Sequence, residues 1–149
     1  VGSEMCIRDR EGEEGVQIKQ FIAGRWAKED PIACLEWAQR LPDGQGKNAS
    51  IGEVVSEWTG QDPDAVYEFL NDMSDRSERD AAVEAFSARI SENDPHSAIA
   101  WVDEIQDSEA RRTAMIRAGR ALMRQSPEEG RQWLQRSGLA EDTRREIEK

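Results

Sequence analysis

The sequence predicts an all-α protein, a right-handed α-α superhelix (solenoid) of four two-helix repeats. Two observations carry this prediction. A proline preceded by Asp or Ser recurs every 32 residues, at Pro31, Pro63, Pro95 and Pro127. Large apolar residues keep the same register on both sides of each of these prolines. Self-similarity at a fixed period of this size is typical of helical solenoids.

The apolar residues form two columns in register with the prolines. The column five residues before each Pro consists of Trp26, Trp58, Ile90 and Leu122. The column six residues after each Pro consists of Trp37, Phe69, Trp101 and Trp133. A column that accepts Trp, Ile or Leu requires volume rather than an indole ring. We therefore interpret both columns as core packing positions and not as ligand-stacking sites.

Each repeat is predicted to form two helices that meet at the Pro-containing corner. Ile51, Val54, Val55 and Trp58 are spaced i, i+3, i+4 and i+7, which is one face of an α-helix. At the corner, Asp or Ser is a favourable N-cap, and Pro suits the first helical position because its missing N–H has no intrahelical partner there. We expect helices near residues 14–28, 31–41, 47–60, 63–73, 77–92, 95–106, 109–125 and 127–137.

These helices predict one helical-repeat domain over residues 11–149. Its units lie near residues 14–41, 47–73, 77–106 and 109–137, with a partial fifth unit at 140–149. The first ten residues, VGSEMCIRDR, share no pattern with the rest and resemble a translated sequencing-adapter scar. We expect residues 1–10 to be a non-native or disordered segment. The sequence indicates no cellular compartment.

The corner segments resemble a known junction between helices. DPIACLEW and DPHSAIAW resemble tetratricopeptide repeats, in which a Pro-containing turn is followed six residues later by Trp. The period of 32 departs from the family's period of about 34. Over residues 14–137, the chain more closely resembles bacterial proteins built from Asp-Pro-x-x-Ala-x-x-Trp units. This resemblance implies an α-α superhelix and little about ligands, because such repeats serve many partners.

The residues that could support catalysis are sparse. His96 is the single histidine, and its equivalents in the other repeats have unrelated side chains, so we expect it at the surface. The PDGQG segment lacks the Lys-Ser/Thr of a phosphate-binding loop. Cys34 shares a column with Val66, Ala98 and Gly130, which indicates a small core residue rather than a nucleophile. We predict no catalytic, metal or cofactor site, and no enzyme activity.

The charge is strongly negative and unevenly distributed. The chain has a formal net charge of −11. Residues 11–108 contain 8 basic and 22 acidic residues, a net of −14, whereas residues 109–149 have a net of +3. An acidic body repels phosphate groups, which argues against nucleic acid and anionic membranes as partners. An RNA-binding repeat array is a weaker hypothesis for the same reason, and there is no apolar run long enough to span a membrane.

The candidate partner-binding residues are Arg117, Arg120 and Arg124, an arginine ridge found in the fourth repeat alone. Their spacing of three and four residues places them on one helix face. That face is rotated by about 200° from the predicted core stripe, at about 100° per residue. Arginine offers planar, bidentate donors that suit carboxylates.

Two interpretations of the arginine ridge stay open at this point. The first is a solvated face whose arginines pair locally with Glu109, Glu128 and Glu129. The second is a docking surface for an acidic protein or peptide, or for the acidic end of a second copy in a head-to-tail association.

The function indicated by these features is a non-catalytic protein–protein interaction scaffold built from helical repeats. The alternative is a structural or regulatory arm of a larger enzyme or sensor whose catalytic domain is absent from this sequence.

Overall fold

The structure is a computed structural model that describes residues 2–149, with side chains from Gly12 onward. Within this range all regular structure is helical, so the prediction of an all-α protein is confirmed. The helices are α1 (Gly2–Trp26), α2 (Pro31–Gln39), α3 (Gln45–Gln61), α4 (Pro63–Asp72), α5 (Arg76–Ile90), α6 (Pro95–Val102), α7 (Ser108–Gln125), α8 (Pro127–Arg136) and α9 (Glu141–Glu148). The prediction about residues 1–10 falls on residues whose side chains lie outside the described part.

The predicted corners are the starts of four helices. Each of the recurring prolines is the first residue of α2, α4, α6 or α8. The Asp before it has a non-helical backbone, with ψ between 76° and 87°, as the clash with the Pro ring requires. The carboxylates of Asp30, Asp62 and Asp94 each accept a hydrogen bond of 3.0 Å from the backbone N–H three residues on. Ser126 makes no such bond. Three of the four corners are therefore closed by an Asp cap.

The cap at Asp94 should make stability depend on pH. Hydrogen bonds that the side chain and then the backbone N–H of Ser97 donate to the carboxylate hold the pKa of Asp94 below its ordinary value. A lowered folded-state pKa contributes stability that is present above about pH 4 and is lost as the pH falls through the folded-state value. We expect Asp94→Ala to cost about 1 kcal/mol at pH 7 and less at pH 3, measured by urea unfolding.

The matched control for this prediction is Ser126→Ala, at the corner without a side-chain cap. We expect it to change stability little at either pH. An Asp94→Ala penalty that stays constant between the two pH values would show that the carboxylate charge does not contribute.

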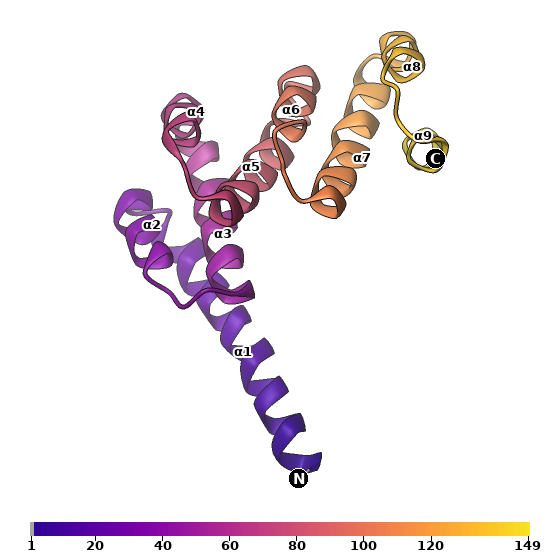
Figure 1. The fold of residues 1–149 in the computed structure, drawn as a ribbon. Coiled ribbons are helices and arrows are strands. Elements are labelled where there is room, and N and C mark those ends of the chain that lie inside the picture. Colours follow the sequence, from indigo (N-terminus) through magenta and orange to yellow (C-terminus); the bar gives the residue numbers. More distant parts are fainter. Residues whose placement is uncertain (1) are drawn as a thin grey trace.

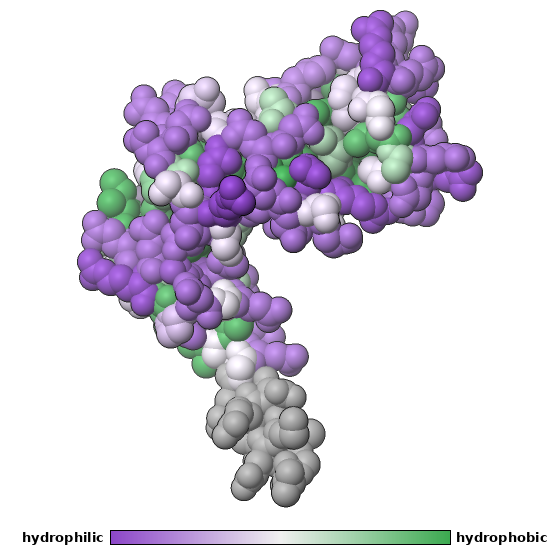
Figure 2. Space-filling model, in the orientation of Figure 1, coloured by the Kyte–Doolittle hydropathy of each residue, from purple (hydrophilic) through white to green (hydrophobic). Residues whose placement is uncertain are grey.

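The helices lie in two sets (Figure 1). The odd-numbered helices α1, α3, α5, α7 and α9 form a row in which each packs against the next. The even-numbered helices pack along this row: α2 against α3, α4 against α3 and α5, α6 against α5 and α7, and α8 against α7. In the view of Figure 2 most of the surface is hydrophilic, and the apolar residues are largely enclosed between the helices.

The two apolar columns meet across the corners, and their interpretation as packing positions is confirmed. The rings of Trp26 and Trp37 lie 6.0 Å apart, and those of Trp58 and Phe69 lie 5.6 Å apart. At the two later Pro corners, Ile90 and Leu122 replace one ring of each pair. All members of both columns are buried or half-buried.

Two predicted helix boundaries were wrong by more than two residues, namely the end of the helix expected over 95–106 and the start of the helix expected over 14–28. The helix expected over 95–106 ends at Val102, and the segment that follows is held by a distant side chain. The two carboxylate oxygens of Asp80, in α5, accept hydrogen bonds of 2.9 Å from the backbone N–H groups of Gln106 and Asp107. These bonds stabilise an extended connection into α7. The helix expected over 14–28 is α1, which begins at Gly2 and ends at Trp26.

Candidate functional site

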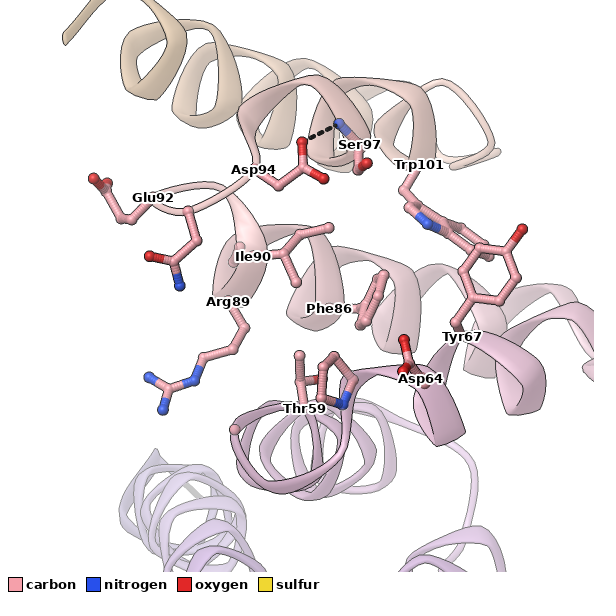
Figure 3. A pocket seen from close by; sticks show the side chains of 14 residues that line it. Thr59, Asp64, Tyr67, Phe86, Arg89, Ile90, Glu92, Asp94, Ser97 and Trp101 are labelled. Atoms are coloured by element: carbon pink, nitrogen blue, oxygen red, sulfur yellow. Dashed lines mark hydrogen bonds between the residues drawn. The ribbon is translucent and has the colours of Figure 1, made fainter. Parts of the chain in front are cut away.

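A groove of about 780 Å³ lies between the α3–α4 pair and the α5–α6 pair. Figure 3 shows it from close by, with α5 along its floor. Phe86 and Ile90 of α5 and Trp101 of α6 supply apolar surface. Polar side chains from the starts of α4 and α6 and from the end of α5 surround this surface. An apolar floor with a polar rim is the usual composition of a protein or peptide binding site.

One end of the groove is formed by stacked aromatic rings. Tyr67 of α4 contacts Trp101 edge-on, with centroids 5.3 Å apart, and Trp101 contacts Phe86 in the same manner at 5.6 Å. Trp101 is 7% exposed, whereas Tyr67 is 51% exposed. The Tyr67 hydroxyl makes no hydrogen bond with any residue that the structure describes. The buried rings thus fix the orientation of an exposed tyrosine, which is a low-entropy anchor for a ligand.

Some charged residues of the groove rim already interact with other residues of the chain, and others do not. Glu92 is paired with Arg124, and Asp94 caps α6. Asp64 and Arg89 are exposed and form no ion pair within the described residues. Figure 3 places Asp64 beside Tyr67 and Arg89 at the opposite end of the groove. A carboxylate and a guanidinium are therefore available at the two ends.

Arg89 lies against α3 at a glycine, Gly60. A Cβ atom built on Gly60 of α3 would lie 2.9 Å from the Arg89 Nη2 atom. Glycine at this position leaves room for the guanidinium to lie along the end of α3.

No sequence pattern singled out Tyr67, Asp64 or Arg89 as site residues. One signal was present, because Tyr67 is the single tyrosine of the chain and lies outside the buried stripe of its helix. Asp64 and Arg89 resemble many other charged residues in the sequence.

The arginine ridge lies on one face of α7, but its members have different surroundings. Arg117 is exposed and forms no ion pair with the described residues. Arg120 is half-buried under α9, where its Nε donates a hydrogen bond of 2.9 Å to the Glu146 carbonyl. Arg124 pairs with Glu92 at the end of α5. A hydrogen bond from Lys149, together with the charges of Lys149 and Arg120, holds the pKa of the Glu146 carboxyl below its ordinary value.

The ion pairs of the ridge differ from the local pairs that the first interpretation assumed. Arg120 and Arg124 pair with Glu146 and Glu92, whereas Glu129 lies 3.1 Å from the Nε2 atom of His96. His96 is exposed, as predicted. The ridge is thus continuous along α7 but is covered by α9 in its middle.

Cys34, the other residue considered as a candidate reactive group, lies in the core. Cys34 is fully buried, and burial, followed by the charge of Asp30, raises the pKa of its thiol to about 11. Its sulfur donates to the Ala23 carbonyl at 3.6 Å. The interpretation of Cys34 as a core residue is confirmed.

Among residues 12–149 no three His, Cys, Asp or Glu side chains lie together as metal ligands would. No helix in the described part of the chain combines the length and the apolar character that crossing a bilayer requires. Comparison of the chain with protein-family models, curated proteins and solved structures finds no match.

Proposed function

We propose that the chain is a non-catalytic protein–protein interaction scaffold, a right-handed α-α superhelix of four two-helix repeats with a partial fifth. The row of odd-numbered helices and the four Pro corners support this architecture. The TPR-like resemblance of the corner segments supports it as well. Such arrays present extended grooves between neighbouring repeats, where a peptide can bind along several helices.

The observation that carries the proposed function is the groove between the α3–α4 and α5–α6 pairs, with Tyr67 held half-exposed at one end. Its apolar floor favours a large apolar side chain of the ligand. Arg89 at one end favours a carboxylate, and Asp64 at the other favours a Lys or Arg. The ligand that fits is a short peptide with an apolar or aromatic residue between an acidic and a basic residue.

This proposal can be tested with a display library of short peptides selected on the full chain. We expect enrichment of peptides that carry an acidic residue, a large apolar residue and a basic residue, in either order along the chain. For the enriched peptides, Tyr67→Ala should raise the Kd at least about tenfold in fluorescence anisotropy, because it removes the aromatic ring that the bound peptide would cover. Arg89→Glu should reverse the preference at the acidic position.

Two control variants make this test specific. Tyr67→Phe keeps the ring and should bind nearly as the wild type does. Ile32→Ala removes an apolar side chain that is 58% exposed on α2, away from the groove, and should leave binding unchanged. If the library yields no sequence pattern, or if Ile32→Ala weakens binding as much as Tyr67→Ala, the groove is not the binding site.

The arginine ridge is a second surface for an acidic partner, and Arg117 is its accessible member. Changing Arg117, Arg120 and Arg124 to Glu tests it, provided that circular dichroism shows α9 still in place. The contact of Arg120 with Glu146 makes that check necessary.

A further inference from the structure

The outer side of α1 carries an exposed apolar stripe with charged ends. Ile18, Phe21 and Ile22 are 58%, 72% and 43% exposed, respectively. Apolar surface is visible on the described part of α1 in Figure 2. Glu14 precedes these residues and Arg25 follows them, both exposed. We name Glu14, Ile18, Phe21 and Arg25 the α1 stripe; their spacing of four, three and four residues is that of a helix seam in a coiled coil.

At two positions of this face the corresponding residues of the later odd-numbered helices are buried, whereas Arg117, three repeats after Phe21, is exposed. One, two and three repeats after Ile18 come residues Ser50, Ala82 and Ala114, all buried. One, two and three repeats after Ile22 come residues Val54, Phe86 and Ala118, also buried. In α3 and α5 this face lies against the preceding odd-numbered helix, since a Cβ on Gly24 would meet Glu53 and a Cβ on Gly52 would lie 3.8 Å from the Ala85 Cβ. The α1 stripe is thus a helix-packing face exposed to solvent.

The charges of the stripe are complementary to themselves in an antiparallel arrangement. A two-fold axis passing between residues 19 and 20 brings Ile18 opposite Phe21 of a second copy. The same axis brings Glu14 opposite Arg25 of the second copy, at both ends of the contact. Neither Glu14 nor Arg25 forms an ion pair within the described residues. Antiparallel packing also aligns opposite ends of the two helix dipoles.

A head-to-tail contact offers the stripe no comparable surface. The exposed residues of the terminal helix and the residue after it are all charged, namely Glu141, Asp142, Arg145, Glu148 and Lys149. Apolar side chains packed there would desolvate charges without compensation.

We propose that the α1 stripe binds a second copy of this chain, antiparallel and related by two-fold symmetry. This inference is independent of the peptide groove. The contact consists of one helix from each copy, so it buries less surface area than an interface of standard size. We expect a dimer with Kd on the order of 10–100 µM.

The test is sedimentation equilibrium of the full chain at concentrations on both sides of that range. Glu14→Lys alone places Lys opposite Arg25, and Arg25→Glu alone places Glu opposite Glu14. Each variant alone should weaken dimerisation several-fold to tenfold, since like charges meet at both ends. An equimolar mixture of the two variants should regain wild-type association, because every pair across the axis is again of opposite charge.

Phe21→Glu should abolish the dimer, while its exposure predicts that circular dichroism will not change. The control is Ile32→Glu, which places the same charge on an exposed isoleucine of α2 and should leave the dimer intact. A chain that stays monomeric at the highest concentration would overturn the proposal and leave the stripe to a different helix or protein. A mixture of the two charge variants that does not regain wild-type dimerisation would also overturn the proposal. Larger oligomers whose formation is unaffected by the α1 variants would overturn it as well and would indicate head-to-tail association.

Discussion

Trp101→Ala is expected to lower the free energy of unfolding by about 3–5 kcal/mol, through lost burial and the cavity that remains. Trp101 is in α6, yet its ring contacts come from two other helices. Tyr67 of α4 and Phe86 of α5 meet its ring edge-on, and the Arg79 guanidinium carbon lies 5.9 Å from its centroid. The side chain therefore joins the second and third helix pairs, and its removal loosens both.

A thermal melt followed by circular dichroism measures this effect. For a chain of this size, the expected loss corresponds to a fall in melting temperature of about 6–20 °C. Trp101→Phe retains an aromatic ring, so its melting temperature should fall less than that of Trp101→Ala. A melting temperature within about 2 °C of the wild type for Trp101→Ala would show that the ring is not a central packing contact.

Leu122→Ala is expected to lower the free energy of unfolding by about 2–5 kcal/mol. Leu122 is fully buried on α7, and its carbonyl accepts the Ser126 N–H at 2.8 Å, directly before α8 begins. The cavity would open at the corner of α7 and α8, where α7 also carries α9. Well-packed helices on several sides limit the collapse that would refill it.

Urea unfolding with a circular-dichroism readout gives the free energy for this variant. Leu139→Ala makes the same chemical change at a half-buried position and should cost distinctly less. Equal losses at the two leucines would contradict the assignment of Leu122 to the centre of the core.

The elements of this fold follow from local features of the sequence. An Asp-Pro pair combines an N-cap oxygen with a residue that cannot extend the preceding helix, so the starts of α2, α4 and α6 were predictable to the residue. Helix ends depend on more distant groups. The connection from α6 into α7 is held by Asp80, more than 20 residues earlier in the chain, and no local sequence pattern indicates that contact.

The candidate surfaces were likewise predictable from the sequence where they depend on local features, and not where they depend on distant contacts. Helix periodicity correctly placed Arg117, Arg120 and Arg124 on one face, because the phase of a helix is a local property. It could not reveal that Glu92 and Glu146 pair with two of them, since these partners depend on how α5, α7 and α9 pack together. The groove at Tyr67 depends likewise on the spacing between two helix pairs.

The packing of each helix against near neighbours in the chain has a kinetic consequence. The main contacts join helices that are adjacent or next-but-one in chain order. Few long loops must close before these contacts form, so folding should be fast for a chain of this length. Opening of a terminal helix pair disturbs one neighbour and leaves the centre intact. Amide hydrogen exchange should therefore be slowest in α3, α5 and α7, which have odd-numbered helices on both sides, and faster in α9.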